Sequence, residues 1–258
     1  MEFLKTNLIN TTTQISVNSN TTVVSNLFNR DPFYQYYSDG LNNDSTTASI
    51  TITFGETTPV SRIGLIDTNI KEFDIFYNGA TANAFSLTDQ ATTTSQFTGN
   101  ADSDVYLRFA TIMVSSITID MKKTISANLE KVLGLFYVAD SYYSFGKIPN
   151  AGGYKPKKVP KQIVHTLSDG GTRIHTVRSK FDLPIQLDYL TDSEVTSIRD
   201  VYDLQDSFQF CAFGTSTGWK NPVFFECVWI GAFDFFEYSD DASASGFSGS
   251  IKLKETPF

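Results

Sequence analysis

Histidine and cysteine, from which many catalytic and metal sites are built, are scarce in this chain. Its 258 residues include two of each. Cys211 and Cys227 lie inside the apolar runs FQFCAF and FFECVWI, which favours two small buried hydrophobic residues; a cross-strand disulfide is the alternative. His165 and His175 have no third donor placed near them by the sequence, so ordinary strand histidines are favoured over a metal site. We predict no metal and no cofactor.

Recognisable catalytic motifs are also missing. The sequence contains no GxSxG, HExxH, P-loop or GxGxxG pattern and no Ser-His-Asp order. Asp240 and Asp241 are adjacent, so on a strand their carboxylates would point to opposite faces. Residues 39–44, DGLNND, are rich in oxygen ligands but lack EF-hand spacing, so a plain turn is favoured and a calcium loop is the alternative. We therefore predict that the protein is not an enzyme.

Long apolar runs are absent as well. No stretch approaches the length that spans a bilayer, so no membrane insertion is predicted. The first ten residues, MEFLKTNLIN, have neither the apolar core nor the small-residue cleavage site of a signal peptide. We expect a protein that is made in the cytosol and stays soluble or leaves as part of something larger.

The apolar residues that are present favour strands. The chain has 22 Phe and 12 Tyr, and its first half is crowded with Thr, Ser and Asn. Residues 49–54, SITITF, alternate apolar and hydroxyl side chains with the period of a half-buried strand. Further strands are predicted in the first half at residues 14–17, 22–24, 61–66, 73–77, 104–109, 115–120 and 133–138. Seven or eight strands without a long helix predict an antiparallel β-sandwich or jelly roll over residues 1–140.

The second half has a different organisation. Residues 141–160 are rich in Pro, Gly and Lys, and we interpret them as a linker or an arm that packs on a neighbour. Residues 161–258 begin with a hairpin around SDGG, followed by a strand over 180–189. Thr191 and Glu194 form a capping box that predicts a helix over 191–204. Strands follow at 207–213, 223–237 and 249–254. The fold class is thus mostly β: a β-sandwich followed by an α+β domain of antiparallel sheet with one helix.

Charge is segregated along the chain. Residues 147–180 hold 8 basic side chains and 1 acidic one, whereas residues 181–258 hold 4 basic and 13 acidic ones. A solvated loop and hairpin is one interpretation. The other is an assembly interface that meets an acidic partner, such as the acidic face of an identical subunit. Specific nucleic-acid binding is not predicted, because the rest of the chain is acidic. The possible interface residues are Lys155, Lys157, Lys158, Lys161, Arg173, Arg178 and Lys180.

The first half resembles the discoidin, or coagulation-factor type C, group of galactose-binding-like jelly rolls. ITITFG at 50–55, FDIFYN at 73–78 and the closing run at 130–138 carry this resemblance, which covers residues 26–140. It implies binding of glycans, lipid head groups or proteins at loops on one end of the sandwich, and in some members a structural calcium. The chain departs from the group because its first half lacks tryptophan and a cysteine pair.

The second half resembles the tube-forming fold of phage tail tube and distal tail proteins. The long hairpin, the single capped helix and the terminal strand carry this resemblance, which is to an order of elements. It implies a ring of subunits whose open sheet edges are paired by neighbours.

Together these observations predict a structural virion protein of a phage tail, tail tip or baseplate. Its second domain would form a homo-oligomeric ring with other tail proteins, and its first domain would decorate the ring. The alternative is a stand-alone carbohydrate-binding or adhesion module that recognises a host-surface glycan. Its possible ligand residues are Tyr34, Tyr36, Tyr37 and Asp39, although core or interface packing would also account for the tyrosines.

Overall fold

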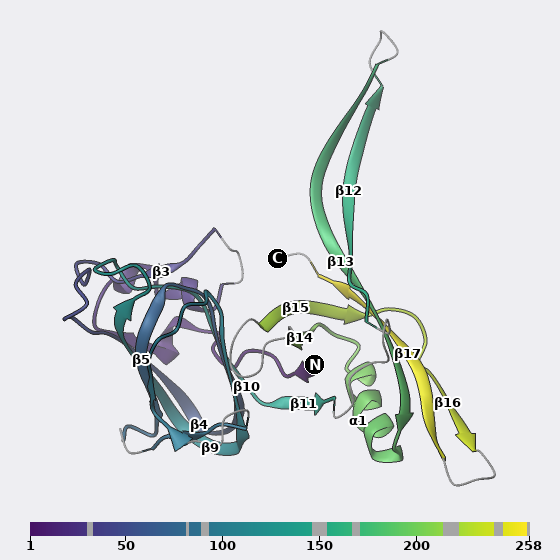
Figure 1. The fold of residues 1–258 in the computed structure, drawn as a ribbon, viewed down its shortest axis with the longest axis horizontal. Helices are drawn as coiled ribbons and strands as arrows, with labels where there is room; N and C mark the ends of the chain where they lie inside the picture. Colours follow the sequence, from purple (N-terminus) through teal and green to yellow (C-terminus); the bar gives the residue numbers. More distant parts are fainter. Residues whose placement is uncertain are drawn as a thin grey trace. The chain divides into compact units, whose positions relative to one another are not determined.

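The structure is a computed structural model that describes residues 1–29, 33–80, 83–88, 93–145, 154–166, 171–213, 222–239 and 245–256. It confirms the predicted class, since the described chain is mostly antiparallel β-sheet (Figure 1). Its elements in order are β1 (Glu2–Leu4), η1 (Thr12–Gln14), β2 (Ile15–Val17), η2 (Thr21–Leu27), β3 (Tyr36–Tyr37), β4 (Ala48–Thr68), β5 (Ile70–Tyr77), β6 (Phe85–Ser86), β7 (Thr93–Thr94), β8 (Gln96–Phe97), β9 (Val105–Thr124), β10 (Val132–Ala139), β11 (Ser141–Ser144), β12 (Lys157–Thr166), β13 (Thr172–Leu190), α1 (Asp192–Asp203), β14 (Phe208–Phe213), β15 (Pro222–Trp229), β16 (Asp234–Ser239) and β17 (Ser245–Glu255).

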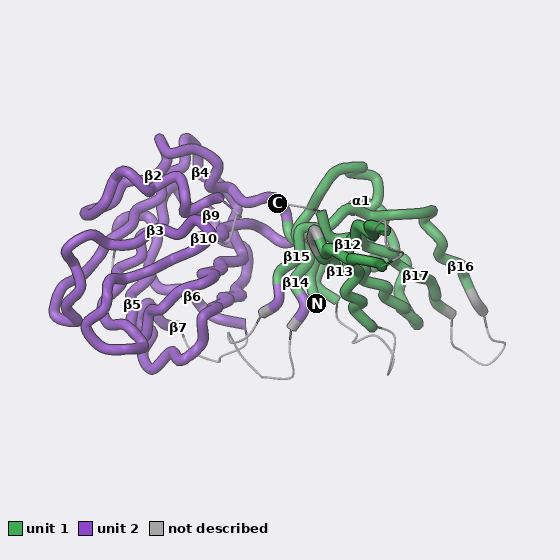
Figure 2. The backbone as a smooth tube through the Cα atoms, turned by 90° about the horizontal axis from the view of Figure 1, so that it is seen from above, with its two compact units in different colours: residues 1–4, 142–211, 224–257 green, residues 5–141, 212–223, 258 purple. Residues whose placement is uncertain are grey.

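The chain divides into two compact units (Figure 2). Unit 2 is built mainly from Lys5–Ser141, and unit 1 combines Met1–Leu4 with Tyr142–Cys211 and Phe224–Pro257. The N-terminal residues join unit 1 because β1 pairs antiparallel with β14. Of the predicted linker, residues 141–144 form β11 and residues 157–160 begin β12, while residues 146–153 lie outside the described chain.

Two long strands organise unit 2. Its large sheet has the order β3-β10-β4-β9-β5-β8, with β2 beside β4, and a small sheet pairs β6 with β7. The sequence predicts separate strands at 49–54 and 61–66, but β4 runs through both, across Gly55 and Pro59, and pairs with β9 on either side. That prediction was wrong because register shifts between Thr53 and Thr58 and between Val60 and Arg62 absorb the irregularity as bulges. The predicted strands at 104–109 and 115–120 are likewise parts of the single strand β9.

The apolar side chains of these strands form one core. Ile50 and Ile52 are fully buried and Phe54 nearly so, which confirms the alternation that predicted a half-buried strand. The strand predicted at residues 22–24 was wrong, because this segment lies in the 3₁₀ helix η2. The helix buries Val24 and Leu27, three residues apart, against the sandwich, and this spacing suits a turn of helix better than a strand.

A glycine in β10 is required by close packing. A Cβ atom added to Gly134 would lie 2.7 Å from Cβ of Asp67 and 3.1 Å from the carbonyl oxygen of Ile66. Asp67 itself has a left-handed backbone, with φ of 52°. The glycine within the apolar run at 132–139 therefore lets β10 approach β4 where β4 is irregular.

Unit 1 is built on a second sheet, in the order β11-β1-β14-β15-β17-β13-β12 with β16 beside β17. Helix α1 begins as predicted: Thr191 caps it and Glu194 completes the capping box. Val195, Ile198 and Val201 are its buried residues. The two cysteines are both buried and free, so the disulfide alternative does not apply.

The hairpin of β12 and β13 extends from this sheet as an arm (Figure 1). Every residue of β12 is exposed, and so are residues 172–176 of β13. The predicted turn at 168–171 lies outside the described residues, apart from Gly171. We use "the arm" below for β12 together with residues 172–182 of β13.

Candidate functional site

Exposed aromatic rings gather on one segment of unit 2, residues 33–39, which we call the aromatic loop. The exposed fractions are 90% for Phe33, 54% for Tyr34 and 43% for Tyr37. Asp39 is exposed at the end of the loop. Tyr36, by contrast, is fully buried, and its hydroxyl donates to the carbonyl oxygen of Ser19 at 2.9 Å. Burial raises the pKa of Tyr36 to about 12, and the ring is not accessible to a ligand.

The backbone of the aromatic loop is held by side chains from the N-terminal segment. The Asn26 amide donates to the carbonyl oxygen of Gln35, and the Asn20 amide donates to that of Tyr37. The Ser19 hydroxyl donates to the carbonyl oxygen of Asp39 at 3.0 Å. Short β3 also pairs with β10 through Tyr36 and Tyr37. The loop is thus positioned by several hydrogen bonds while three of its rings face solvent, an arrangement that preorganises a binding surface.

A buried lysine supports the segment that follows. Lys131 is fully buried, and its Nζ donates to the carbonyl oxygens of Leu41 at 2.7 Å and Asn43 at 2.8 Å. The hydroxyl of Thr46 lies 3.3 Å from the same nitrogen. Burial lowers the pKa of Lys131, and the negative charge of Asp44 partly opposes this effect. Residues 41–44, weighed above as part of a calcium loop, therefore direct the backbone oxygens of Leu41 and Asn43 at a lysine ammonium.

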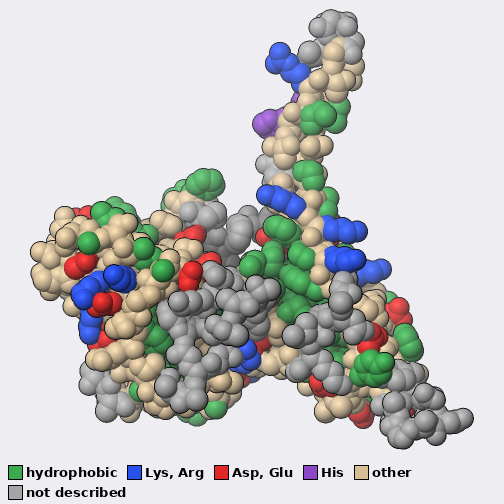
Figure 3. Space-filling view, viewed as in Figure 1, with side chains coloured by type: hydrophobic (Ala, Val, Ile, Leu, Met, Phe, Trp, Pro, Cys, Tyr) green, Lys and Arg blue, Asp and Glu red, His purple; other side chains and the backbone are tan. Residues whose placement is uncertain are grey.

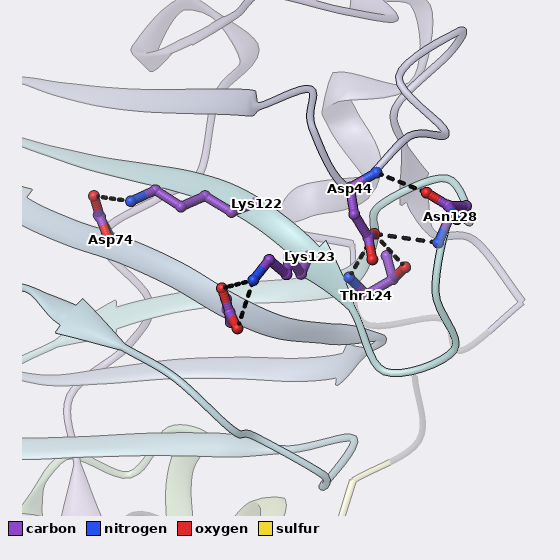
Figure 4. A network of polar contacts seen from close by, with 7 residues as sticks. Asp44, Asp74, Lys122, Lys123, Thr124 and Asn128 are labelled. Atoms are coloured by element: carbon purple, nitrogen blue, oxygen red, sulfur yellow. Dashed lines mark hydrogen bonds and ion pairs between the residues drawn. The ribbon is translucent and has the colours of Figure 1, made fainter.

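The carboxylate of Asp44 ties the same segment to the loop after β9 (Figure 4). Its Oδ1 accepts from the backbone and hydroxyl of Thr124, at 3.2 and 3.1 Å, and from the backbone of Asn128 at 3.2 Å. Burial raises the pKa of Asp44, but these hydrogen bonds and the charge of Lys131 outweigh it and leave the pKa below its usual value. Nearby on the sheet, Lys122 pairs with Asp74 and Lys123 with Glu72.

The second candidate surface is the arm of unit 1, where the predicted interface lysines lie. Lys155, Lys157, Lys158, Lys161 and Arg173 are exposed and Lys180 is partly exposed, and Figure 3 shows the basic side chains along the arm and at its base. Arg178 lies in β13 opposite Lys161, but its side chain is outside the described part. Lys155 precedes β12, and the other residues of the set come from two strands that are hydrogen-bonded neighbours, so the structure brings those residues together.

A bulge in β13 decides which arm residues share a face. Lys161 pairs with Arg178 but Gln162 pairs with Thr176, so residue 177 is the extra residue. Side chains of directly paired residues point to the same side of a sheet. The residues on one face, which we call the basic face, are Lys157, Val159, Lys161, Ile163 and His165 of β12, and Arg173, His175, Lys180 and Asp182 of β13. The same face continues onto Lys252 and Lys254 of β17.

Neither a metal-binding cluster nor a membrane-spanning helix is found among the described residues. Among the described residues no cluster of three His, Cys, Asp or Glu side chains could hold a metal ion. His165 pairs with Arg173 and His175 with Ile163, so the two histidines are diagonal and not directly opposite. Within the described ranges, no helix is both long enough and apolar enough to cross a bilayer.

Sequence reasoning missed two residues that shape these surfaces. Phe33 is the most exposed ring of the aromatic loop, and its position three residues before Tyr36 was the available signal. Lys131 stands at the start of the apolar run of β10, where a lysine ordinarily marks a solvated strand end. Its burial depends on residues 41–46, some ninety positions earlier, which no local pattern reveals.

No family model matches the chain, and no curated protein matches it. Solved structures similar to it include chitosan-binding module 2 of a Paenibacillus sp. IK-5 chitosanase/glucanase, with 17% identity, a TM-score of 0.37, and coverage of 48% of this chain and 93% of that one. A CBM32 module of Clostridium perfringens has 11% identity, a TM-score of 0.35, and coverage of 48% and 90%. A pectin-binding module has 13% identity, a TM-score of 0.36, and coverage of 56% and 96%. These neighbours have a galactose-binding-like fold type, and none of them supports the tail-tube resemblance.

Proposed function

We propose that this protein binds carbohydrate without transforming it, and that the aromatic loop of unit 2 is the ligand site. The observation that carries the proposal is the set of three exposed rings, Phe33, Tyr34 and Tyr37, on a segment held by hydrogen bonds. The C–H faces of sugar rings pack against aromatic rings, and aromatic side chains present large rigid surfaces at low entropic cost. Asp39 adds a carboxylate that can accept from sugar hydroxyls.

The structural neighbours do not indicate which sugar this protein would bind. Their names mention chitosan and pectin, which differ in charge, and the likeness carries no weight for either. The proposal rests on the aromatic loop alone, and it predicts a ligand with an exposed apolar sugar face.

A glycan array probed with the full chain tests this proposal. Binding to a defined glycan, measured afterwards by calorimetry, should fall at least about tenfold in Phe33→Ala and in Tyr34→Ala, because an aromatic anchor is removed in each. Phe236→Ala is the matched control, since Phe236 is also an exposed phenylalanine but lies in unit 1. No binding on the array, or equal loss in the control, would reject the proposal. Hydrolysis of the bound glycan that is lost on changing one polar side chain would reject its non-catalytic part.

A second candidate function is favoured by the arm. β12 is an edge strand with every residue exposed, and a neighbouring subunit can pair such an edge. We therefore keep the structural role as the second candidate: a virion subunit of a phage tail, tail tip or baseplate, located in the virion. The comparisons give it no support. Light scattering over a range of concentration and salt tests it, and a strict monomer under all conditions would count against it.

A further inference from the structure

Within a single chain, β12 of the arm is exposed along its whole length. An isolated two-stranded hairpin is at best marginally stable in water. The arm nevertheless exposes apolar side chains on both faces: Val164 is 58% exposed and Ile174 61% on one, and Ile163 is 44% exposed on the other. A surface of another molecule that covers the arm would remove these side chains from water.

The chemistry of the arm indicates what that surface carries. The arm places four described lysine and arginine side chains on its basic face, Lys252 and Lys254 of β17 continue that face, and Asp182 is the single carboxylate in this set. At the base of the arm, Val159, Lys161, Lys180, Asp182 and Lys254 line an open groove of about 320 Å³. A concave surface with several ammonium groups favours a convex partner that is rich in carboxylates.

Unit 1 itself presents such a convex surface on helix α1. Asp192, Asp200 and Asp203 are exposed on the helix, and Asp206 is exposed just after it. The first three are eight and three positions apart, which places them on one side of a helix. Two of them lie near the C-terminal end, where the helix dipole is negative and where the last turn has no basic residue. Carboxylates are unfavourable at that end unless a cation approaches.

We infer that the basic face of the arm docks against the exposed side of α1 of a second copy of this chain. Within one copy the arm extends away from α1 and β12 is exposed along its whole length, so the two surfaces remain available to neighbours (Figure 1). The contact joins two different surfaces, so each copy keeps one of each, and copies add head to tail into a closed ring or a filament. This inference is independent of carbohydrate binding by the aromatic loop.

Matched neutral and acidic substitutions on the two faces of the arm test the docking face. Lys157→Gln, Lys161→Gln and Arg173→Gln together lower the charge of the basic face by three. Gln162→Glu, Thr166→Glu and Ser179→Glu lower the charge of the opposite face by the same amount. Sedimentation velocity of the full chain at low salt should show self-association that the first variant weakens by about 10- to 100-fold. The second variant should keep most of it, and high salt should weaken the wild type.

A charge exchange tests the partner surface. The variant Asp192→Lys, Asp200→Lys, Asp203→Lys should not self-associate, and neither should Lys157→Glu, Lys161→Glu, Arg173→Glu. An equimolar mixture of the two should associate, because each supplies one complementary surface to the other. Circular dichroism of each variant checks that it folds. Association of the α1 variant at wild-type strength would show that the arm binds another surface, and would overturn the inference.

Three further outcomes also overturn it. The first is a wild type that stays monomeric at low salt and high concentration. The second is equal weakening by both neutral and acidic arm variants. The third is binding of duplex DNA or heparin through the basic face without any change in oligomeric state, because the partner would then be a polyanion of another class.

Discussion

The sandwich of unit 2 and the arm of unit 1 are both antiparallel β structure, yet they place the same residue types in opposite environments. Ile117 and Ile119 of β9 are fully buried, whereas Ile163 and Ile174 of the arm are 44% and 61% exposed. Alternating apolar residues therefore indicate a strand in both regions, but they do not indicate what covers it. In the sandwich the chain covers its own strands, and in the arm the covering surface has to come from elsewhere.

The largest expected difference follows from one substitution made in both regions. Ile117→Ala should lower the free energy of unfolding by about 2–5 kcal/mol, because it removes a buried side chain and leaves a cavity. Ile174→Ala should change it by less than about 0.5 kcal/mol under monomeric conditions, because the side chain is exposed. Urea denaturation followed by circular dichroism measures both. Similar losses in the two variants would show that the arm is buried within its own chain, and the comparison would fail.

A buried and a surface lysine of unit 2 can be compared in the same way. Lys131→Met should destabilise unit 2 by about 1–3 kcal/mol, because it removes the donor to the carbonyl oxygens of Leu41 and Asn43 and leaves the Asn43 oxygen with its bonds from Thr46 alone. Lys123→Met is the control, since Lys123 forms an ion pair with Glu72 at the surface and its loss should matter little. Thermal unfolding by circular dichroism compares the two. If the variants melt together, the ammonium of Lys131 is not what holds residues 41–46.

The variant Lys131→Met also tests whether the segment after the aromatic loop affects glycan binding. Ser38 exchanges two hydrogen bonds with the backbone of Lys131, so residues 33–46 and β10 are held at one position. In Lys131→Met, hydrogen exchange of residues 41–46 should be faster, whereas exchange in β9 should be unchanged. Glycan affinity should fall less than in Phe33→Ala, because the rings remain in place.

These two regions also show what could be predicted from the sequence. The alternation of SITITF, the hairpin and the capping box of Thr191 and Glu194 are local patterns, and the structure contains each of them. The continuity of β4 through Pro59 and the 3₁₀ helix at 21–27 depend on bulges and on packing against distant strands, so local propensity pointed the wrong way. The pairing of β1 with β14 joins residues some two hundred positions apart.

The candidate sites divide in the same way. Charge counting found the lysines of the arm, because charge is visible residue by residue. It could not find their common face, which depends on where the extra residue of the bulge lies. Aromatic counting found Tyr34 and Tyr37 but gave Tyr36 the same role. Tyr37, the next residue of β3, faces solvent, whereas the ring of Tyr36 enters the core.

A smaller effect is expected when the pH is lowered, because the stability of unit 2 depends in part on the charge of Asp140. Asp140 accepts from the Ser61 hydroxyl at 2.6 Å and pairs with Lys5 at 2.9 Å. Burial raises the pKa of Asp140, but these contacts outweigh it and hold the pKa below the ordinary value of 3.8. A lowered folded-state pKa stabilises the protein above that value, and the stabilisation is lost as the pH falls through the folded-state pKa. Asp140→Asn should therefore flatten the loss of stability with acid below about pH 4, and Ser61→Ala should flatten it in part. Urea midpoints from pH 6 to pH 2.5 measure this, and parallel curves for wild type and Asp140→Asn would contradict it.

The smallest effect on stability is expected from removing the bulge of the arm. Deletion of Val177 would restore a regular ladder between β12 and β13, with Arg178 still opposite Lys161 and Thr176 still opposite Gln162. The outer pairs keep their partners, so Arg173 and His175 stay on the same face as Lys161 and Lys180. Because the arm is exposed, the unfolding midpoint of the monomer should stay within experimental error, and self-association at low salt should stay close to that of the wild type. Clearly weaker association would mean that the twist added by the bulge is needed for docking in addition to the shared face. A deletion that unfolds unit 1 would mean that the arm is part of its core. The arm would then be buried by its own chain, as the strands of unit 2 are, and the two regions would not differ in this respect.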